Sequence, residues 1–243
     1  MKPLTFLFIF FIALSFGNAK NTDTIQSTSK TFNHELWTKL LQAHVSETGR
    51  VDYEGFKENR NQLLDYIQQL SENTPTESWS KPAILAYWIN AYNALTIDLI
   101  LQYYPVKSIK DIHKPWDKRL WKLGEKQYSL NEIEHDILRN MNESRIHFSI
   151  VCASVSCPKL QNKAYTPEDL ERQLTQVAKE FLKDSSKNEL SENSIKLSKI
   201  FRWFADDFQK NGTLIEFLNL YAPIHISAKA KKSFKDYNWN LNN

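Results

Sequence analysis

Two residue types that mark common functional classes are scarce in this chain of 243 residues. Only 5 residues are glycine, and none fits the G-x-G-x-x-G or G-x-x-x-x-G-K-[ST] patterns whose backbone N–H groups hold phosphates. Only 2 residues are cysteine, too few for a small scaffold held together by disulfides. These scarcities exclude the usual nucleotide-binding loops and the disulfide-rich class.

Charge of one sign is not concentrated in the sequence either. The 31 Lys and Arg residues stand against 28 Asp and Glu, both signs are interspersed, and the formal net charge is +3. A nucleic-acid-binding domain shows a concentrated basic face, so no nucleic-acid partner is expected. The 6 histidines and 2 cysteines lack H-x-x-x-H and C-x-x-C spacing, and we predict no metal ion or other cofactor.

The N-terminus has the pattern of an export signal. Lys2 precedes an apolar run over residues 4–16, and Gly17 and Ala19 are small residues at the expected cleavage site. The apolar run is shorter than the roughly 20 residues of a membrane-spanning helix. We therefore predict a signal peptide over 1–19 and an exported protein, periplasmic or secreted, with no stable membrane anchor after cleavage. An uncleaved anchor is the alternative.

The remaining sequence predicts one domain. Residues 20–31 are rich in Thr, Ser, Asn and Lys and predict a flexible leader, and residues 32–243 contain no repeat and no long linker. A helix over 81–103 is apolar around most of its circumference, which indicates a central buried helix. A membrane span is disfavoured there, because Asn90, Asn93 and Asp98 fall in mid-segment. Asn90 and Asn93 share one face of this helix.

The other periodic segments predict a helix-rich α+β fold with a small, mainly antiparallel sheet. Gly124 and Glu125 predict a hairpin turn, and Ser129 with Glu132 forms a capping box that opens a helix through residue 141. Residues 146–151 and 195–197 predict strands. Helices are predicted from Asn33, which is a good cap, over 63–70, and from residues 164, 198 and 213.

Residues 145–158 concentrate reactive side chains. On a strand, His147 and Cys152 point to opposite faces, whereas Cys157 lies beyond the strand and before Pro158. A cysteine that caps a helix has a lowered pKa, so Cys157 is the favoured nucleophile. Three interpretations stay open: a Cys152–Cys157 disulfide, a nucleophile served by His147 or His135, and two packed thiols.

Other side chains can complete a site. Glu134 and Asp207 can orient a histidine, although a surface ion pair and a helix cap are the simpler roles. Arg145 can bind an anionic group of a substrate or form a structural ion pair. Asn90 and Asn93 must find hydrogen bonds in the core or in a site.

Several motifs resemble domain-of-unknown-function family 547. The resemblance runs in order over most of residues 50–242 and is carried by the segments 86–96, 108–111, 128–135, 145–148, 152–160, 197–208 and 237–242. The family name implies no established reaction. The resemblance points to a site made of Asn90, Asn93, Glu134, His135, Arg145, His147, Cys152, Cys157 and Asp207.

These observations lead to two functional hypotheses. In the first, the protein is a thiol-dependent hydrolase or acyltransferase for a peptide-like or amide substrate, with Cys157 as nucleophile and His147 as base. Glu134 or Asp207 then orients the base, and Asn90 holds the oxyanion. In the second, the protein is a non-catalytic module with a Cys152–Cys157 disulfide. Asn90, Asn93 and Arg145 then hold a small-molecule or peptide ligand.

Overall fold

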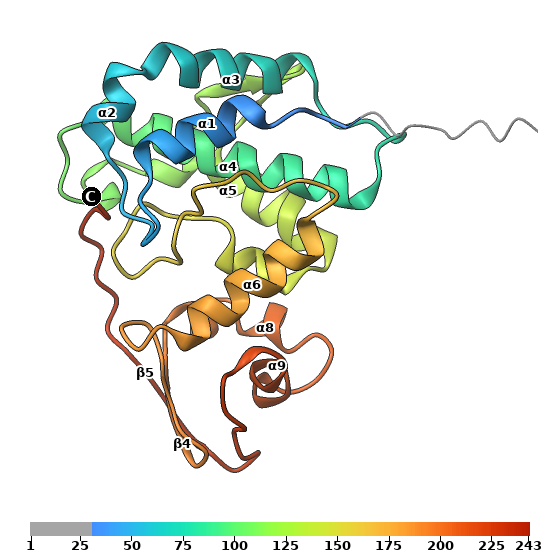
Figure 1. Ribbon diagram of the computed structural model, residues 1–243, viewed down its shortest axis with the longest axis vertical. Coiled ribbons are helices and arrows are strands. Elements are labelled where there is room, and N and C mark those ends of the chain that lie inside the picture. The colour runs from blue at the N-terminus through green and yellow to red at the C-terminus, as the bar shows by residue number, and fades with distance from the viewer. Residues whose placement is uncertain (1–30) are drawn as a thin grey trace, which may run out of the picture.

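The computed structural model describes residues 31–243. Residues 1–30, with the predicted signal peptide and nearly all of the predicted leader, lie outside the described residues. The described chain is a helix-rich α+β domain with a buried central helix, as the sequence predicts (Figure 1). Two small sheets accompany the helices, one of two strands and one of three.

The central helix α4 (Lys81–Tyr103) organises the core. It begins where the Ser80 side chain accepts a hydrogen bond from the Ala83 N–H, with Pro82 in the first turn. Within the described residues it is the one helix long and apolar enough to cross a membrane, but 94% of its most apolar window is buried inside the structure. The helix is therefore a core element of the fold.

Three helices pack above α4: α1 (Glu35–His44), α2 (Tyr53–Glu58) and α3 (Arg60–Glu72) (Figure 1). Trp37 of α1 stacks on Tyr66 of α3 with ring centroids 5.6 Å apart. Asn33 is not the cap residue that the sequence predicts, because His34 occupies that position. The Asn33 side chain still accepts a hydrogen bond from the Glu35 N–H at 2.7 Å.

The middle of the chain supplies a hairpin beside α3 and a helical segment that packs against α4. The hairpin of β1 (Trp121–Leu123) and β2 (Lys126–Tyr128) and the Ser129–Glu132 capping box of α5 (Leu130–Glu132) confirm two sequence predictions. The predicted long helix continues as a π-helix, η3 (Ile133–Leu138), and a 3₁₀ turn, η4 (Arg139–Met141). The π-helix contains Glu134 and His135. π-Helical turns are frequent at functional sites.

The strand predicted over 146–151 is wrong. Residues Ser144–Phe148 form a 3₁₀ helix, η5, which begins where the Glu143 side chain accepts the Arg145 N–H. The backbone that follows is paired by a side chain rather than by a strand. The Asn93 amide donates to the Ser149 carbonyl at 2.9 Å and accepts from the Val151 N–H at 3.0 Å. This pairing satisfies the polar backbone groups that would otherwise need a sheet.

The C-terminal half forms a second layer. It contains α6 (Leu170–Lys183), α7 (Ile200–Trp203), α8 (Ala205–Phe208), α9 (Leu214–Tyr221), and the strands β3 (Glu189–Leu190), β4 (Ser194–Leu197) and β5 (Lys231–Phe234). The strand order is β3-β4-β5; β3 pairs antiparallel with β4, and β5 pairs parallel with β4. After β5 the chain returns along the side of the molecule to α2 (Figure 1). There the Tyr53 hydroxyl donates to Asn242 at 2.8 Å.

Candidate functional site

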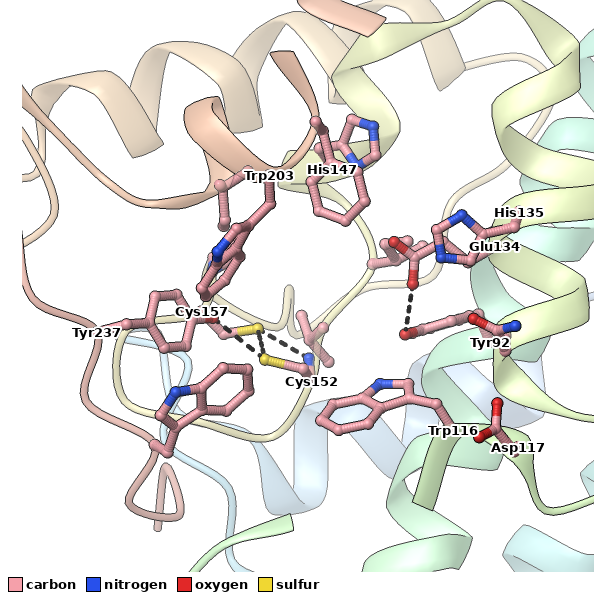
Figure 2. Close-up of a pocket in the computed structure, with 17 residues that line it drawn as sticks. Tyr92, Trp116, Asp117, Glu134, His135, His147, Cys152, Cys157, Trp203 and Tyr237 are labelled. Carbon is pink, nitrogen blue, oxygen red and sulfur yellow. Dashed lines mark hydrogen bonds between the residues drawn. The ribbon is translucent and has the colours of Figure 1, made fainter. Parts of the chain in front are cut away.

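A cavity of about 410 Å³ lies between the two layers and is bordered by 17 residues (Figure 2). Its walls are strongly aromatic, from Tyr92, Trp116, Trp203, Phe204, Tyr237 and Trp239. Its polar and reactive lining includes both cysteines, Glu134, His135 and His147. Five of the nine residues predicted for the site therefore meet in one cavity.

Both cysteines belong to one tight loop. The Ala153 backbone has a left-handed φ of 59°, and the Cys157 N–H donates to the Ser154 carbonyl at 2.9 Å. The C-terminal segment pairs with the outside of the loop, where the Val155 N–H donates to the Asn240 carbonyl at 2.8 Å. This geometry brings the two Sγ atoms to 2.6 Å from each other, with both thiols free.

The Cys152 thiol is partly exposed and lies among hydrogen-bonding groups. Besides Cys157, its Sγ contacts the Ser154 Oγ at 3.0 Å and the Tyr237 hydroxyl at 3.2 Å. Burial raises the pKa of Cys152, but the hydrogen bonds from Cys157, Ser154 and Tyr237 outweigh burial and lower the pKa below its usual value. Hydrogen bonds of this kind favour the thiolate, which is the nucleophilic form of cysteine.

Cys157 has different surroundings, and the helix whose dipole was expected to lower its pKa does not form. No helix follows it, so no helix dipole acts on its sulfur. Its side chain is only 5% exposed, and burial followed by the neighbouring Cys152 raises its pKa well above the usual value. The Cys152 N–H donates to the Cys157 Sγ at 2.8 Å. Of the two thiols, Cys152 is the more exposed and the one whose pKa is lowered.

Glu134 lies on the opposite wall of the cavity from the thiols (Figure 2). It is buried, and its Oε2 accepts a hydrogen bond from the Tyr92 hydroxyl at 3.0 Å. Burial raises the pKa of Glu134 to about 7, against the opposing effects of Tyr92 and Arg139. A carboxyl group with a pKa near 7 can both donate and accept a proton at neutral pH.

His147 is held by Asp207 rather than by a cysteine. Its Nε2 lies 2.8 Å from the Asp207 Oδ2, and its ring stacks on Phe204 at 3.9 Å. Burial lowers the pKa of His147, so the imidazole is neutral at pH 7. Figure 2 shows this ring and the two sulfurs in different parts of the site. The predicted orientation of a histidine by Asp207 is present, but the predicted Cys157–His147 contact is not formed.

Arg139 links this pair to His135. Its guanidinium donates to the Asp207 Oδ2 at 2.6 Å and lies 2.7 Å from the His135 Nδ1. Burial raises the pKa of Asp207, but hydrogen bonds from His147 and Arg139 outweigh it and keep the carboxylate ionised. His135 thus belongs to a hydrogen-bonded wall of the cavity, and Asp207 stabilises that wall from behind.

Three residues predicted to hold a ligand have structural roles. Asn90 donates to the Tyr165 carbonyl at 2.8 Å and accepts from the Tyr165 N–H at 3.0 Å, and it is not among the residues that line the cavity. Asn93 pairs with the backbone beside the cysteine loop in the same way. Arg145 forms two-pronged ion pairs with Glu143 and Glu171, which leaves its guanidinium saturated.

One family model matches the middle of the chain. Residues 76–182 match the model of a family described as "Protein of unknown function, DUF547". This central segment belongs to that family. No curated protein and no solved structure matches the chain. The DUF547 segment carries both cysteines, Glu134, His135 and His147, whereas Asp207 and the aromatic residues Trp203, Tyr237 and Trp239 come from beyond it.

Several residues of the site were not predicted from the sequence. Ser154 and Tyr237 contact the Cys152 sulfur, Tyr92 contacts Glu134, and Arg139 joins Asp207 to His135. Only the spacing of Arg139, four residues after His135 on a predicted helix, indicated such a contact. Among residues 31–243, no group of three or more His, Cys, Asp and Glu side chains is arranged to hold a metal ion.

Proposed function

We propose that the protein is a thiol-dependent enzyme that hydrolyses an amide or peptide-like substrate, or transfers its acyl group, with Cys152 as the nucleophile. The supporting observation is the set of hydrogen-bonding contacts that the Cys152 sulfur makes with Cys157, Ser154 and Tyr237. These donors favour the thiolate without a histidine in contact. A thiol with a lowered pKa loses its proton more readily, so attack on a carbonyl carbon depends less on a separate base.

Glu134 supplies the proton transfers in this proposal. The Cys152 thiolate attacks the substrate carbonyl carbon, and the C–N bond breaks as the leaving amine takes the proton of the Glu134 carboxyl. The product is a thioester on Cys152. Water then gives a proton to the Glu134 carboxylate and its oxygen attacks the thioester, which releases the acid and restores the thiolate. An amine or alcohol in place of water gives acyl transfer.

Two features of the cavity suit such a substrate. The Tyr237 hydroxyl lies 3.2 Å from the Cys152 sulfur and is a donor beside the carbon at which the oxyanion forms. Trp203, Tyr237 and Trp239 contact one another, with centroid separations of 4.5–5.7 Å, and form a continuous aromatic wall. This wall favours substrates with apolar or aromatic groups near the reacting carbonyl.

Acyl transfer is tested with two substrate types that differ in their leaving group. A panel of p-nitrophenyl esters and peptide p-nitroanilides is incubated with the purified protein, and the acyl group is located by peptide mass mapping. We expect acylation of Cys152, and its loss in Cys152→Ser. Glu134→Gln is expected to slow anilide turnover by about 10²–10⁴-fold. Ester acylation changes little in this variant, because nitrophenolate leaves without an acid.

The result that overturns the proposal is equally specific. Acyl groups found elsewhere than on Cys152, or equal turnover in wild type and Cys152→Ser, contradict a nucleophilic Cys152. Cys157→Ser is the companion variant, since it leaves the proposed nucleophile in place and its hydroxyl can still donate a hydrogen bond to the Cys152 sulfur. This variant is expected to retain acylation.

We also propose that the protein is exported, on the basis of the signal-peptide pattern over residues 1–19. Expression in a Gram-negative bacterium followed by osmotic fractionation and N-terminal mass analysis tests this. A periplasmic chain that begins at residue 20 is the expected result. A cytoplasmic chain that retains Met1 contradicts it.

A further inference from the structure

Cys157 forms no bond to the substrate in the acyl-transfer proposal, yet its sulfur contacts the reactive atom. Its Sγ lies 2.6 Å from the Cys152 Sγ, close to the roughly 2.05 Å of an S–S bond. The two residues are five positions apart, and the loop between them is paired on its outside with the C-terminal segment. A small displacement of one sulfur therefore suffices to join the pair.

We infer that Cys157 is a resolving thiol, and that the Cys152–Cys157 pair catalyses thiol–disulfide exchange with a disulfide-bonded substrate in the aromatic cavity. This inference rests on the nucleophilic Cys152 of the proposed function. It adds a second activity and a second substrate class, a small organic or peptide disulfide.

Exposure fixes the order in which the sulfurs react. Both cysteines line the cavity, but Cys152 is partly exposed whereas Cys157 is only 5% exposed. An entering disulfide therefore meets Cys152 first. Cys157 can reach a sulfur only when that sulfur is Cys152 or is bonded to it. This division between an attacking and a resolving thiol is what exchange through a mixed disulfide requires.

The steps balance in atoms and electrons. The Cys152 thiolate attacks one sulfur of R–S–S–R, so that the bond Cys152–S–S–R forms and one RS⁻ leaves. Cys157 then loses its proton, and its sulfur attacks the Cys152 sulfur. The bond to R breaks, and the second R sulfur leaves and takes up a proton. The protein dithiol is oxidised to a disulfide, and the substrate is reduced to two thiols; a dithiol reductant returns the pair to its starting state.

A backbone donor supports the second step. The Cys152 N–H points at the Cys157 Sγ at 2.8 Å. When Cys152 is held in a mixed disulfide, its sulfur is no longer an anion, and this N–H remains available for the negative charge that develops on Cys157. The donor is part of the loop backbone, so it needs no rearrangement between the steps. Lys187 donates a hydrogen bond to the Val155 carbonyl and so stabilises the same loop.

The cavity walls define the substrate further. Trp116, Trp203, Tyr237 and Trp239 present aromatic faces, and Trp203 is 45% exposed at the rim. A disulfide that carries flat, uncharged groups gains contact with these faces. A disulfide that carries several charges must lose hydration to enter. We therefore expect a neutral aromatic disulfide to react faster than a charged peptide disulfide.

Single-turnover chemistry tests the inference with two probes, 2,2′-dithiodipyridine and glutathione disulfide. For each probe, the rate is divided by the rate of the same probe with free cysteine, which removes intrinsic reactivity. Reduced wild-type protein is expected to release two equivalents of small thiol and to lose the mass of two hydrogen atoms. Peptide mapping is expected to find the Cys152–Cys157 disulfide, and the normalised rate is expected to be higher for dithiodipyridine.

The variants separate the steps. Cys157→Ser is expected to stop at the mixed disulfide, with one equivalent released and the probe's half retained on Cys152. Cys157→Ala is the second form of this test, and circular dichroism establishes that each variant is folded. Cys152→Ser is expected to lose the fast reaction, because Cys157 is buried. Wild type that keeps the probe on Cys152, or a variant that still releases two equivalents, overturns the inference.

The outcomes distinguish this inference from the acyl-transfer proposal. If esters acylate Cys152 in both wild type and Cys157→Ser while no internal disulfide forms, only the resolving role of Cys157 is wrong. If the disulfide forms but esters and anilides never acylate Cys152, only the acyl-transfer proposal is wrong. If Cys152 reacts with neither probe type, both are wrong.

Discussion

The Nε2 of His147 lies 2.8 Å from the Oδ2 of Asp207, although 60 positions separate the two residues in sequence. The contact joins the 3₁₀ helix Ser144–Phe148 to the short helix Ala205–Phe208. Arg139 donates to the same carboxylate, so one buried anion holds three elements around the cavity. Asp207 therefore fixes the wall on which His135, His147 and Phe204 lie.

Asp207→Asn is expected to destabilise the protein by about 2–3 kcal/mol, because hydrogen bonds between charged partners are replaced by weaker ones and Arg139 loses its counter-ion. Urea denaturation at pH 7 measures the change. Asp206→Asn is the matched control, since Asp206 is exposed one position away and should change stability by less than about 0.5 kcal/mol. Equal midpoints for the two variants contradict the role assigned to Asp207.

Stability is expected to fall in acid partly through His34. This residue is buried, its Nδ1 lies 2.6 Å from the Tyr66 hydroxyl, and burial lowers its pKa to about 3. The unfolded chain binds a proton below about pH 6.5, whereas the folded chain resists protonation down to about pH 3. The folded state therefore loses stability as the pH falls through this window, with a slope of up to about 1.4 kcal/mol per pH unit.

The variant His34→Gln tests this assignment, because glutamine does not titrate. Unfolding free energies measured from pH 6.5 to pH 4 should fall less steeply in His34→Gln than in wild type. His225→Gln replaces an exposed histidine and should keep the wild-type slope. Parallel pH profiles for wild type and His34→Gln assign the acid sensitivity to other groups, of which Asp207 is one.

Alkylation should single out Cys152. Its lowered pKa predicts that iodoacetamide modifies Cys152 at a lower pH than it modifies free cysteine, while the buried Cys157 reacts only after unfolding. Tyr237→Phe removes one donor from the sulfur and should raise the midpoint of the alkylation profile by about one pH unit. Tyr103→Phe replaces an exposed tyrosine and serves as the control. An unchanged midpoint in Tyr237→Phe contradicts the assigned hydrogen bond.

The pH dependence of amide turnover should report Glu134. Burial raises its pKa to about 7, and the protonated carboxyl is the proposed acid, so turnover should decline above pH 7. The Tyr92 hydroxyl opposes this shift by donating to the carboxylate. Tyr92→Phe should therefore raise the pKa further and move the alkaline decline upward, and Glu134→Gln should abolish the decline. A decline that stays in place in both variants belongs to another group.

Asn93→Ala is expected to cost about 2–4 kcal/mol of stability, since it leaves the Ser149 carbonyl and the Val151 N–H buried without their partner. Thermal unfolding followed by circular dichroism measures the loss. Asn140→Ala removes an exposed amide from the helical segment before this loop and should change little. If the two variants unfold at the same temperature, the backbone at 149–151 is held by other contacts.

Local signals in the sequence were sufficient for elements whose determinants are adjacent residues. The Ser129–Glu132 capping box and the hairpin at Gly124 form as predicted, because each depends on groups within four positions. Residues 146–151 contain the β-branched and aromatic side chains of a strand, yet they do not form one. Their pairing partner is the side chain of Asn93, more than 50 positions away, and no local pattern contains that information.

The site was predicted in composition but not in arrangement. Sequence reasoning brought Glu134, His135, His147 and both cysteines together, and the cavity contains all five. It assigned the activated thiol to Cys157, because a following proline suggested a helix that does not form. The activation of Cys152 depends on Tyr237, 85 positions downstream, and on a loop shape that the C-terminal segment imposes. Neither is visible in the spacing of the cysteines.

Cys152 and Tyr237 are 85 positions apart, and this separation determines the order in which the parts of the site are synthesised. During translation the cysteine loop emerges from the ribosome long before the segment that pairs with it. Until that segment docks, Cys152 lacks the Tyr237 hydroxyl and the aromatic wall of Tyr237 and Trp239, and its chemistry is nearer to that of a common surface thiol. The contacts that surround the Cys152 sulfur are therefore complete only after the C-terminal segment has docked.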